Sequence, residues 1–393
     1  MGCRSLFDQV IDRRNTQCVK WDGVAEIFGK EDLLPMWVAD MDFYPPEAVI
    51  GAVKARATHG VFGYETKSAG LDEAVVEWIT IRHDWVIDPT WLNHSPGVVS
   101  GLATAILALT EPGDQVVIQP PVYPPFYSVG DQNDRLVVEN PLIVKNGRYT
   151  MNLPELEEIF QSGVKLLILC SPHNPVGRVW SRAELLALGE LVVKYEVTVL
   201  SDEIWSDLVF HSQKHIPLAS LSTGIADRTI TFMAPSKTFN LAGLYLSNVI
   251  IPNQELREKF CDQMQRLAQG HTNVFAPVAA EVAYRQGKEW LDELVTYLEE
   301  NVEYVKAELA KITPKIKIAQ PEGTYVLWMD CRDLGIPAEE LNQFFVREAG
   351  IAFNDGVMFG PQGAGFQRMN IGCPRSLITE AIERMAKALE GYK

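Results

Sequence analysis

The sequence predicts an α/β protein that has a large domain with a mostly parallel sheet and a smaller α+β domain after it. Short β-branched runs alternate with helical stretches through the middle of the chain, an order typical of a parallel sheet covered by helices. Most of these runs are apolar throughout rather than alternating, which favours strands buried on both faces. Beyond about residue 254 the pattern changes to long helices that carry many charges.

The expected elements of the large domain follow one another along the chain. A helix over 98–110 contains no charged residue, and a second helix covers 182–195. The expected strands are short and are followed by polar residues or turns. They cover 115–119, 135–139, 165–170, 196–200, 228–233 and 247–251.

The last part of the chain predicts the smaller domain. Its expected helices cover 255–268, 288–311, 338–348 and 377–389, and a β-like run covers 324–329. We divide the chain into an N-terminal segment that packs with the small domain, a large domain and a small domain. Their expected bounds are 1–45, 46–285 and 286–393.

Composition narrows the range of functions. The 393 residues include 35 basic and 51 acidic side chains, and the net charge of −16 argues against nucleic-acid binding. The longest stretch without a charged side chain, 89–110, contains two prolines, an asparagine and a histidine, which argues against a membrane span. The seven histidines lack the spacing of metal ligands, so no metal is expected. We expect a cytoplasmic protein.

Four chemically different side chains follow four of the expected strands. They are an aromatic ring, a carboxamide, a carboxylate and an amine, on Tyr123, Asn174, Asp202 and Lys237. In an open α/β sheet, ligands bind outside the carboxyl ends of the strands. The four groups are therefore expected to face one crevice.

Pyridoxal phosphate requires groups of this kind. A lysine in a covered site has a lowered pKa and forms a Schiff base with a carbonyl, and a carboxylate pairs with the protonated ring nitrogen. An aromatic side chain stacks on the ring, and an amide donates to its phenolate oxygen. The helix over 98–110, which follows Ser95-Pro96-Gly97, offers free N–H groups to a phosphate. The hydroxyls of Ser236 and Thr238 are further donors beside the lysine.

Each of these residues also has a plain structural interpretation. A lysine is usually a surface charge, an aspartate after a strand often caps a helix, and Asn174-Pro-Val-Gly177 is typical of a turn. Tyr123, which precedes two prolines, fits simple packing. The occurrence of all four at the ends of strands of one sheet favours the cofactor.

Seven motifs, in one order along the chain, carry a family resemblance. They are Asp12-Arg-Arg-Asn15 with Trp21-Asp22, Met36-Trp-Val-Ala-Asp-Met-Asp-Phe43, Val61-Phe-Gly-Tyr64, Cys170-Ser-Pro-His-Asn-Pro-Val-Gly177, Ser201-Asp-Glu-Ile204, Ala234-Pro-Ser-Lys-Thr-Phe-Asn-Leu-Ala-Gly243 and Arg368-Met-Asn-Ile-Gly-Cys-Pro-Arg375. The chain resembles fold-type I pyridoxal-phosphate enzymes, the aminotransferase class I/II superfamily, over essentially its whole length. It is most similar to the cystathionine β-lyase subgroup of MalY, PatB and cystalysin. The resemblance implies a seven-stranded sheet in the large domain.

The resemblance implies a role for each residue near the cofactor. Lys237 forms the Schiff base and moves the substrate proton, and Asp202 keeps the ring nitrogen protonated. Asn174 contacts the ring oxygen, and Tyr123 stacks on the ring; Lys237 and Tyr123 are the expected catalytic residues. The phosphate is expected at the N–H groups of Val98 and Val99.

The resemblance also implies a substrate site and a subunit interface. Arg368 is expected to bind the substrate α-carboxylate in a bidentate manner, with help from Asn174 and the backbone of Ala39. Tyr64 resembles a tyrosine that reaches the phosphate of the neighbouring subunit's cofactor. A homodimer with active sites at its interface is therefore expected.

Two positions depart from the superfamily's usual pattern. Trp205 stands where a tyrosine or histidine donates to the cofactor's phenolate oxygen, and its indole N–H donates but cannot accept. Tyr245 stands where transaminases often carry a phosphate-binding arginine. The second departure makes an aspartate transaminase less favoured.

The implied activity is that of a carbon–sulfur β-lyase. It would convert L-cystathionine or a related S-substituted cysteine to a thiol, pyruvate and ammonia. An aminotransferase would use the same lysine, aspartate and arginine, so it stays the alternative. A regulatory protein that keeps the cofactor and binds a partner is a third hypothesis, against which the intact Lys237, Asp202 and Arg368 argue.

Overall fold

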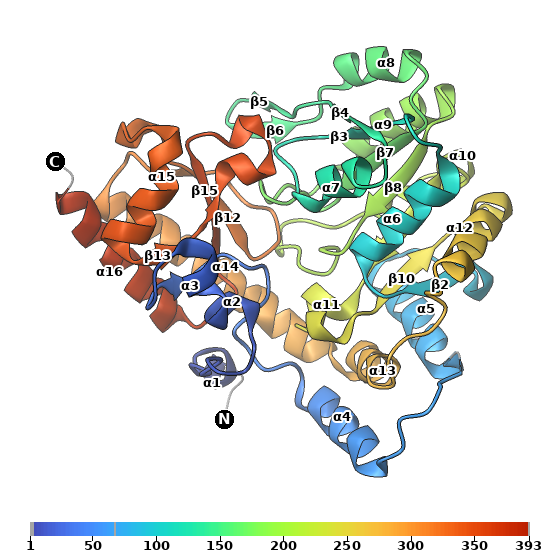
Figure 1. The fold of residues 1–393 in the computed structure, drawn as a ribbon, viewed down its shortest axis with the longest axis horizontal. Coiled ribbons are helices and arrows are strands. Elements are labelled where there is room, and N and C mark those ends of the chain that lie inside the picture. Colours follow the sequence, from blue (N-terminus) through green and yellow to red (C-terminus); the bar gives the residue numbers. More distant parts are fainter. Residues whose placement is uncertain (1–3, 67, 392–393) are drawn as a thin grey trace.

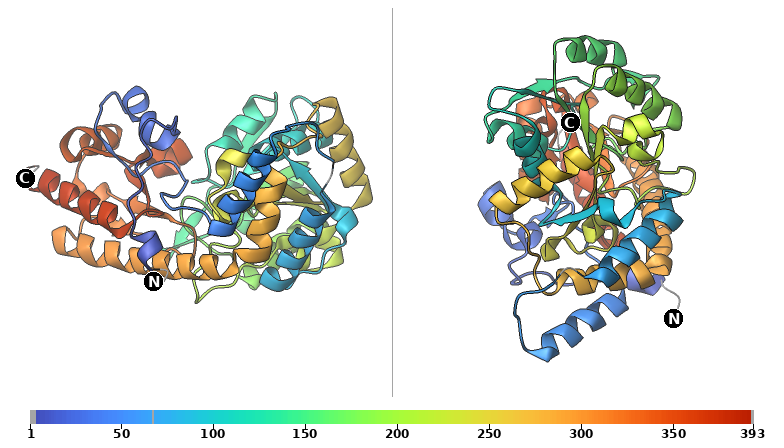
Figure 2. Two further views of the ribbon diagram at one scale, coloured as in Figure 1. Left: turned by 90° about the horizontal axis from the view of Figure 1, so that it is seen from below. Right: turned by 90° about the vertical axis from the view of Figure 1, so that its right-hand side faces the viewer.

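The structure, a computed structural model, describes residues 4–66 and 68–391. Figure 1 shows a large part built around a central sheet and, beside it, a smaller part formed by the C-terminal residues. Helices α1 (Arg4–Phe7), α2 (Val19–Asp22) and α3 (Val24–Phe28), drawn in dark blue, lie next to that smaller part. The long helix α14 (Lys288–Ile312) extends along both parts (Figures 1 and 2).

The central sheet has seven strands and is mostly parallel, as predicted. Its spatial order is β2 (Leu92–Ser95), β10 (Ser247–Ile250), β9 (Thr229–Met233), β8 (Thr198–Asp202), β7 (Leu166–Cys170), β3 (Gln115–Ile118) and β4 (Leu136–Glu139). Strand β10 runs antiparallel to both of its neighbours. The neighbouring strands β9, β8, β7 and β3 are parallel, so their carboxyl ends share one edge.

Both faces of this sheet are buried. In β3, Val116 and Ile118 belong to the apolar core on one face, whereas Val117 between them belongs to the core on the other. This explains why the strands are apolar throughout. The first face is covered by α6 (Val98–Leu109), α7 (Pro125–Asp131) and α12 (Gln254–Arg266), and the second by α8 (Leu153–Gln161), α9 (Arg182–Lys194) and α10 (Thr223–Ala226).

Three further helices complete the large part. Helix α13 (Ala276–Gln286) packs against α4 (Glu47–His59) and α5 (Ala69–His83).

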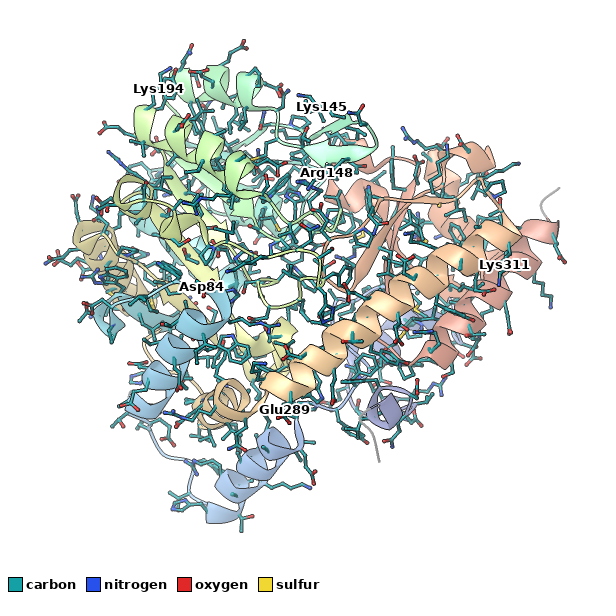
Figure 3. All side chains as sticks on the ribbon, turned by 180° about the vertical axis from the view of Figure 1, so that it is seen from behind. Asp84, Lys145, Arg148, Lys194, Glu289 and Lys311 are labelled. Carbon is teal, nitrogen blue, oxygen red and sulfur yellow. The ribbon has the colours of Figure 1, made fainter. Side chains whose placement is uncertain are left out.

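Charged side chains lie around the outside of the molecule, and Figure 3 labels six of them. Among these, Asp84 and Lys194 are more than half exposed.

The smaller part contains an antiparallel sheet. Its order is β11 (Lys317–Ile318), β12 (Val326–Asp330), β15 (Phe366–Asn370) and β14 (Asn354–Asp355). It packs with α14, α15 (Ala338–Phe344) and α16 (Arg375–Gly391).

The N-terminal segment pairs with the smaller part. Its strand β1 (Leu34–Pro35) forms a parallel pair with β13 (Ile351–Ala352). The division of the chain at residues 45 and 285 stays a prediction. The segment's helices are α1 (Arg4–Phe7), α2 (Val19–Asp22) and α3 (Val24–Phe28).

The remaining elements are short. Strands β5 (Ile143–Lys145) and β6 (Arg148–Thr150) form a hairpin, α11 covers Pro235–Thr238, and a π-helical turn covers Phe345–Ala349. Short 3₁₀ turns lie at Pro89–Trp91, Leu218–Ser220, Ala242–Leu244, Arg332–Leu334, Gly356–Phe359 and Pro361–Gly363.

The structure corrects three sequence predictions. The strand predicted over 196–200 begins at Thr198, because Glu196 has a φ of 56° and lies in a turn. Strand β2 was not predicted, since its sequence Leu-Asn-His-Ser is half polar; pairing with β10 holds it in the sheet. The helix predicted over 338–348 leaves the α-helical pattern after Phe344 and continues as the π-helical turn.

A helix that spans a membrane must be both long and apolar. No helix within the described residues meets both requirements.

Candidate active site

A cavity of about 410 Å³ lies at the carboxyl ends of β3, β7, β8 and β9. Its lining comes from the large part, the smaller part and the N-terminal segment. It includes all of the residues predicted for the site except Tyr64 and Thr238: Ala39, Val98, Val99, Tyr123, Asn174, Asp202, Trp205, Ser236, Lys237 and Arg368. Tyr64 does not line it and is 98% exposed.

Lys237 enters the cavity from the short helix α11 that follows β9. Its Nζ donates a hydrogen bond of 2.6 Å to the carbonyl oxygen of Ala39. Burial disfavours the charged amine, and the positive charge of Arg368 adds to this effect, so the pKa of Lys237 falls to about 8. A substantial fraction of this amine is therefore neutral near physiological pH.

Asp202 is the last residue of β8 and is 3% exposed. Its Oδ1 accepts a hydrogen bond of 3.1 Å from the backbone N–H of Ile204. Burial disfavours the carboxylate, and the neighbouring Glu203 repels it, so the pKa of Asp202 rises to about 7. A cationic N–H group at this carboxyl would lower that pKa again.

Arg368 reaches the cavity from β15 of the smaller part. Its Nη1 donates to Asn174 Oδ1 at 2.9 Å, and its Nη2 donates to the carbonyl oxygen of Trp37 at 2.9 Å and to Asn354 Oδ1 at 2.6 Å. Its Nε has no hydrogen-bond partner among the described residues. Burial lowers the pKa of Arg368 to about 10, so the guanidinium stays charged at neutral pH.

The N-terminus of α6 opens toward the same cavity. Gly97, which precedes it, has a φ of 124°, and a Cβ built there would meet no atom within 4 Å. The first N–H groups of a helix have no partner inside the helix, so those of Val98 and Val99 are available to an anion.

One predicted contact differs in the structure. The hydroxyl of Thr238, expected as a phosphate donor beside the lysine, instead donates to the buried Asp207 Oδ2 at 2.8 Å. Trp205 packs edge-on against Tyr325, with ring centroids 4.6 Å apart, and its ring lies 5.7 Å from Lys237 Nζ.

Comparisons with known proteins identify the family. Residues 31–385 match the family described as aminotransferase class I and II. The chain is 47% identical to cystathionine beta-lyase PatB of Bacillus subtilis (strain 168) over 98% of this chain and 99% of that protein. It is 33% identical to protein MalY of Escherichia coli (strain K12), over 98% and 99% of the two chains. The structure of cystalysin from Treponema denticola, which contains pyridoxal 5'-phosphate, matches with a TM-score of 0.95 and 36% identity over 98% of this chain and 99% of that one.

The chain belongs to this family. It is a pyridoxal-phosphate-dependent carbon–sulfur lyase of the cystathionine β-lyase type, with the fold of fold-type I enzymes. We refer to it below as the lyase.

The residues that line the cavity of the lyase fit pyridoxal phosphate in their chemistry. Open space at Gly97 and free N–H groups suit the phosphate, and the raised pKa of Asp202 marks a buried carboxyl that a cationic ring nitrogen would stabilise. Lys237 supplies the amine, and the ring of Tyr123 lines the same space. No three His, Cys, Asp or Glu side chains within the described residues gather as a metal ion would need.

The lyase also has site residues that sequence analysis did not single out. The hydroxyl of Tyr325 donates to the Ala39 carbonyl oxygen at 2.8 Å, beside the bond from Lys237. Asn354 and the carbonyl of Trp37 hold Arg368. Trp37 lies in the motif from Met36 to Phe43, so the sequence did indicate that segment. Nothing in the sequence around Asn354 or Tyr325 pointed to the site.

Proposed function

We propose that the lyase cleaves the Cβ–S bond of L-cystathionine or a related S-substituted cysteine. With L-cystathionine, one water is consumed, and homocysteine, pyruvate and ammonia leave. The observation that carries the proposal is a lysine amine with a pKa of about 8 in one cavity with a buried carboxyl and a buried guanidinium. The relatives named cystathionine β-lyase support the choice of reaction.

Arg368 is the proposed anchor for the substrate α-carboxylate. A guanidinium offers two parallel N–H groups to a carboxylate, a geometry that lysine cannot match. Its bonds to Asn354 and to the Trp37 carbonyl fix the plane of the group. Asn174, bonded to Arg368 Nη1, and the backbone of Ala39 complete the proposed substrate site.

Lys237 is the proposed base that removes the Cα proton. Its lowered pKa makes a neutral amine available near physiological pH. Pyridoxal phosphate, when bound, supplies the electron sink for the electron pair that this proton leaves behind. Asp202 would keep the ring nitrogen protonated, and the ring of Tyr123, which lines the same cavity, would stack on the cofactor.

The remaining groups are proposed to bind the cofactor. The N–H groups of Val98 and Val99 and the hydroxyl of Ser236 bind its phosphate, as their places in the cavity lining support. Trp205 lies beside Lys237 and lines the wall of the ring site.

We also propose that the lyase is a homodimer. Tyr64 is 98% exposed, and its neighbours Val61 and Phe62 are 63% and 58% exposed. Such an apolar segment is suited to an interface with a second copy, in which Tyr64 reaches the partner's phosphate site. Tyr245 lines the cavity and is 66% exposed, so we propose that it lies near this interface. We propose a cytoplasmic location, where its amino-acid substrates are metabolised.

Two incubations of the purified protein test the reaction. One supplies L-cystathionine, and the other supplies an amino acid with 2-oxoglutarate. Thiol together with pyruvate is expected from the first. Glutamate from the second would identify an aminotransferase instead, and no product from either would favour a binding protein. Lys237→Ala is expected to abolish turnover, and a variant that kept full activity would contradict the assignment.

A further inference from the structure

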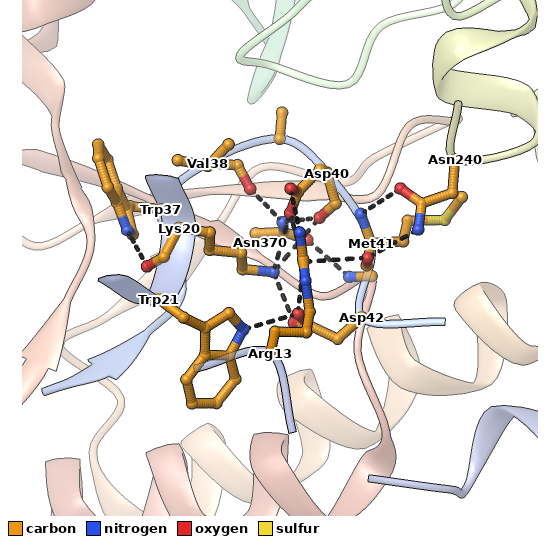
Figure 4. Close-up of polar contacts among 12 residues, drawn as sticks. Arg13, Lys20, Trp21, Trp37, Val38, Asp40, Met41, Asp42, Asn240 and Asn370 are labelled. Carbon is orange, nitrogen blue, oxygen red and sulfur yellow. Dashed lines mark hydrogen bonds and ion pairs between the residues drawn. The ribbon is translucent and has the colours of Figure 1, made fainter. Parts of the chain in front are cut away.

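Residues 37–42, which we call the strap, form no helix or strand and lie between the N-terminal segment and the active site. Trp37, Val38 and Ala39 line the site cavity. Figure 4 shows that side chains from several parts of the molecule converge on the strap backbone.

Five consecutive strap carbonyl oxygens accept hydrogen bonds from side chains. The donors lie in the N-terminal segment, the large part and the smaller part, so the strap connects all three. The pairs are Trp37 with Arg368, Val38 with Asn370, Ala39 with Lys237 and Tyr325, Asp40 with Lys20 and Asn370, and Met41 with Arg13 and Asn240. Two of the donors, Lys237 and Arg368, are proposed catalytic and substrate-binding groups.

The two strap carboxylates, Asp40 and Asp42, form an ion cluster with side chains of the N-terminal segment (Figure 4). Asp42, 1% exposed, accepts from Lys20 Nζ at 2.6 Å, from Arg13 Nη1 at 2.7 Å and from Trp21 Nε1 at 2.9 Å. Asp40 accepts from both Nη atoms of Arg13, at 2.7 and 3.0 Å. Two cations therefore balance two carboxylates.

Lys20 is the most buried cation of this cluster. Its side chain is 1% exposed, and its Nζ bonds both the Asp42 carboxylate and the Asp40 carbonyl oxygen. A buried ion pair gives little net stability compared with apolar side chains of the same size, because both ions lose their hydration. Its directed bonds do fix geometry, and here they fix the backbone that faces the active site.

We propose that Lys20 and Asp42 are positioning residues of the active site. Their ion pair holds the strap so that the Ala39 carbonyl meets Lys237 and the Trp37 carbonyl meets Arg368. This gives a role to Arg13 and Trp21 of the first N-terminal motif, neither of which lines the site cavity.

The test replaces the pair without changing the net charge, in the variant Lys20→Met with Asp42→Asn. The charged groups that act on Lys237 are Asp40 on the strap, Asp202 on β8 and Arg368 on β15. If the strap moves away, Lys237 loses the Ala39 carbonyl and the Asp40 carboxylate, both of which favour its protonated form. In cofactor-free protein, the rate at which added pyridoxal phosphate becomes attached to Lys237, followed by visible absorption, depends on the neutral amine. The pH midpoint of this attachment rate is expected to fall by about one unit.

The same variant tests the substrate site. With the Trp37 carbonyl displaced, Arg368 is held less firmly, and KM for L-cystathionine is expected to rise about tenfold. The KM readout rests on the proposed function. The midpoint of the attachment rate requires only that the cofactor reacts with Lys237, so its failure is distinguishable from failure of the proposed reaction.

Two more variants separate positioning from stability. Arg135→Met removes another buried cation, which bonds Thr110 and Asn133 near the far end of α6. This variant is expected to lower the melting temperature but to leave the pH midpoint for Lys237 and the KM for L-cystathionine unchanged. Arg13→Lys keeps the charge and loses the two-pronged bond to Asp40, and a smaller shift in the same direction is expected.

The outcomes decide the proposal. A lower midpoint and a higher KM in the pair variant, absent from Arg135→Met, support it. Wild-type values in a folded pair variant overturn it, since the pair would then serve stability alone. If the pair variant does not fold, Arg13→Lys decides in the same way.

Discussion

Asp202 and Lys237 have pKa values that burial moves toward each other, to about 7 and about 8. The folded pKa of Asp202 lies above its ordinary value of 3.8, so the folded chain holds this proton more tightly than the unfolded chain does. Stability from this group is therefore present at low pH and is lost as pH rises toward about 7. Lys237, whose pKa falls from 10.5, acts in the other direction between about 8 and 10.5.

The first prediction follows from the Asp202 shift. Without cofactor, the melting temperature of the wild type is expected to fall between pH 5 and pH 7 more than that of Asp202→Asn, which has no proton to lose. Thermal unfolding at pH 5, 6 and 7 measures this difference. Addition of pyridoxal phosphate should reduce the wild-type dependence, because a cationic ring nitrogen stabilises the carboxylate. Equal slopes for the two proteins would contradict the assignment of the shift to Asp202.

The second prediction concerns Arg368. One ammonium cannot replace two guanidinium N–H groups that bond Asn174, Asn354 and the Trp37 carbonyl. Arg368→Lys is expected to raise KM for the amino-acid substrate at least about tenfold, with a smaller change in kcat.

The control for Arg368 is Arg332. Arg368 lies 4.9 Å from the centroid of the Phe359 ring, and Arg332 lies 4.8 Å from the centroid of Phe366. Arg332, however, is exposed and bonds Asp330 outside the cavity. Arg332→Lys is expected to leave KM unchanged. A similar KM effect in both variants would mean that the Arg368 result does not report carboxylate binding.

Among the elements, α6 depends on the glycine before it. Gly97 has a φ of 124° and a ψ of 158°, a conformation that side chains other than hydrogen rarely adopt. The third prediction is that Gly97→Ala lowers stability by about 1–3 kcal/mol and weakens pyridoxal-phosphate binding at least about tenfold. Fluorescence titration with the cofactor measures the binding. Gly224→Ala in α10, where a Cβ makes only ordinary contacts, is the control and should keep wild-type affinity.

At this scale the sequence predicted the central strands well. The strands of the large sheet that were predicted begin and end within two residues of the predicted bounds, because burial on both faces makes them apolar throughout. Strand β2 was not predicted, because its sequence is half polar and only its pairing with β10 identifies it as a strand. The motif from Met36 to Phe43 indicated the family, but its contacts were not predictable. Arg368 bonds the Trp37 carbonyl across 331 residues of chain, a distance over which spacing carries no information.

At the scale of the whole molecule, the proposed dimer makes each site depend on two chains. The fourth prediction uses this dependence. Tyr64→Ala and Lys237→Ala are each expected to have little activity alone. After the two are unfolded and refolded together, mixed dimers contain one site with both an intact lysine and the partner's intact tyrosine. Activity of up to about a quarter of wild type is then expected.

Sedimentation of the wild type should show a species of twice the chain mass. A mixed sample with no more activity than the sum of its two components would contradict a site shared between subunits. Lys194→Ala, on the outer surface of α9, replaces Tyr64→Ala in a control mixture with Lys237→Ala. That mixture should lose activity only by dilution.

The carbonyl contacts of residues 37–42 have a consequence for how this enzyme can be altered. Every residue type carries the same peptide oxygen, so exchanging Val38 or Ala39 for another small side chain leaves the acceptors in place. Substitutions of the side chains that donate to these carbonyl oxygens, such as Asn370, are instead expected to disturb the site. In a saturation library, small substitutions at Val38 and Ala39, next to the reacting amine, would then keep activity. Substitutions at the distant donors would lose it. Engineering that targets only cavity-lining positions would overlook the residues that set the shape of the pocket.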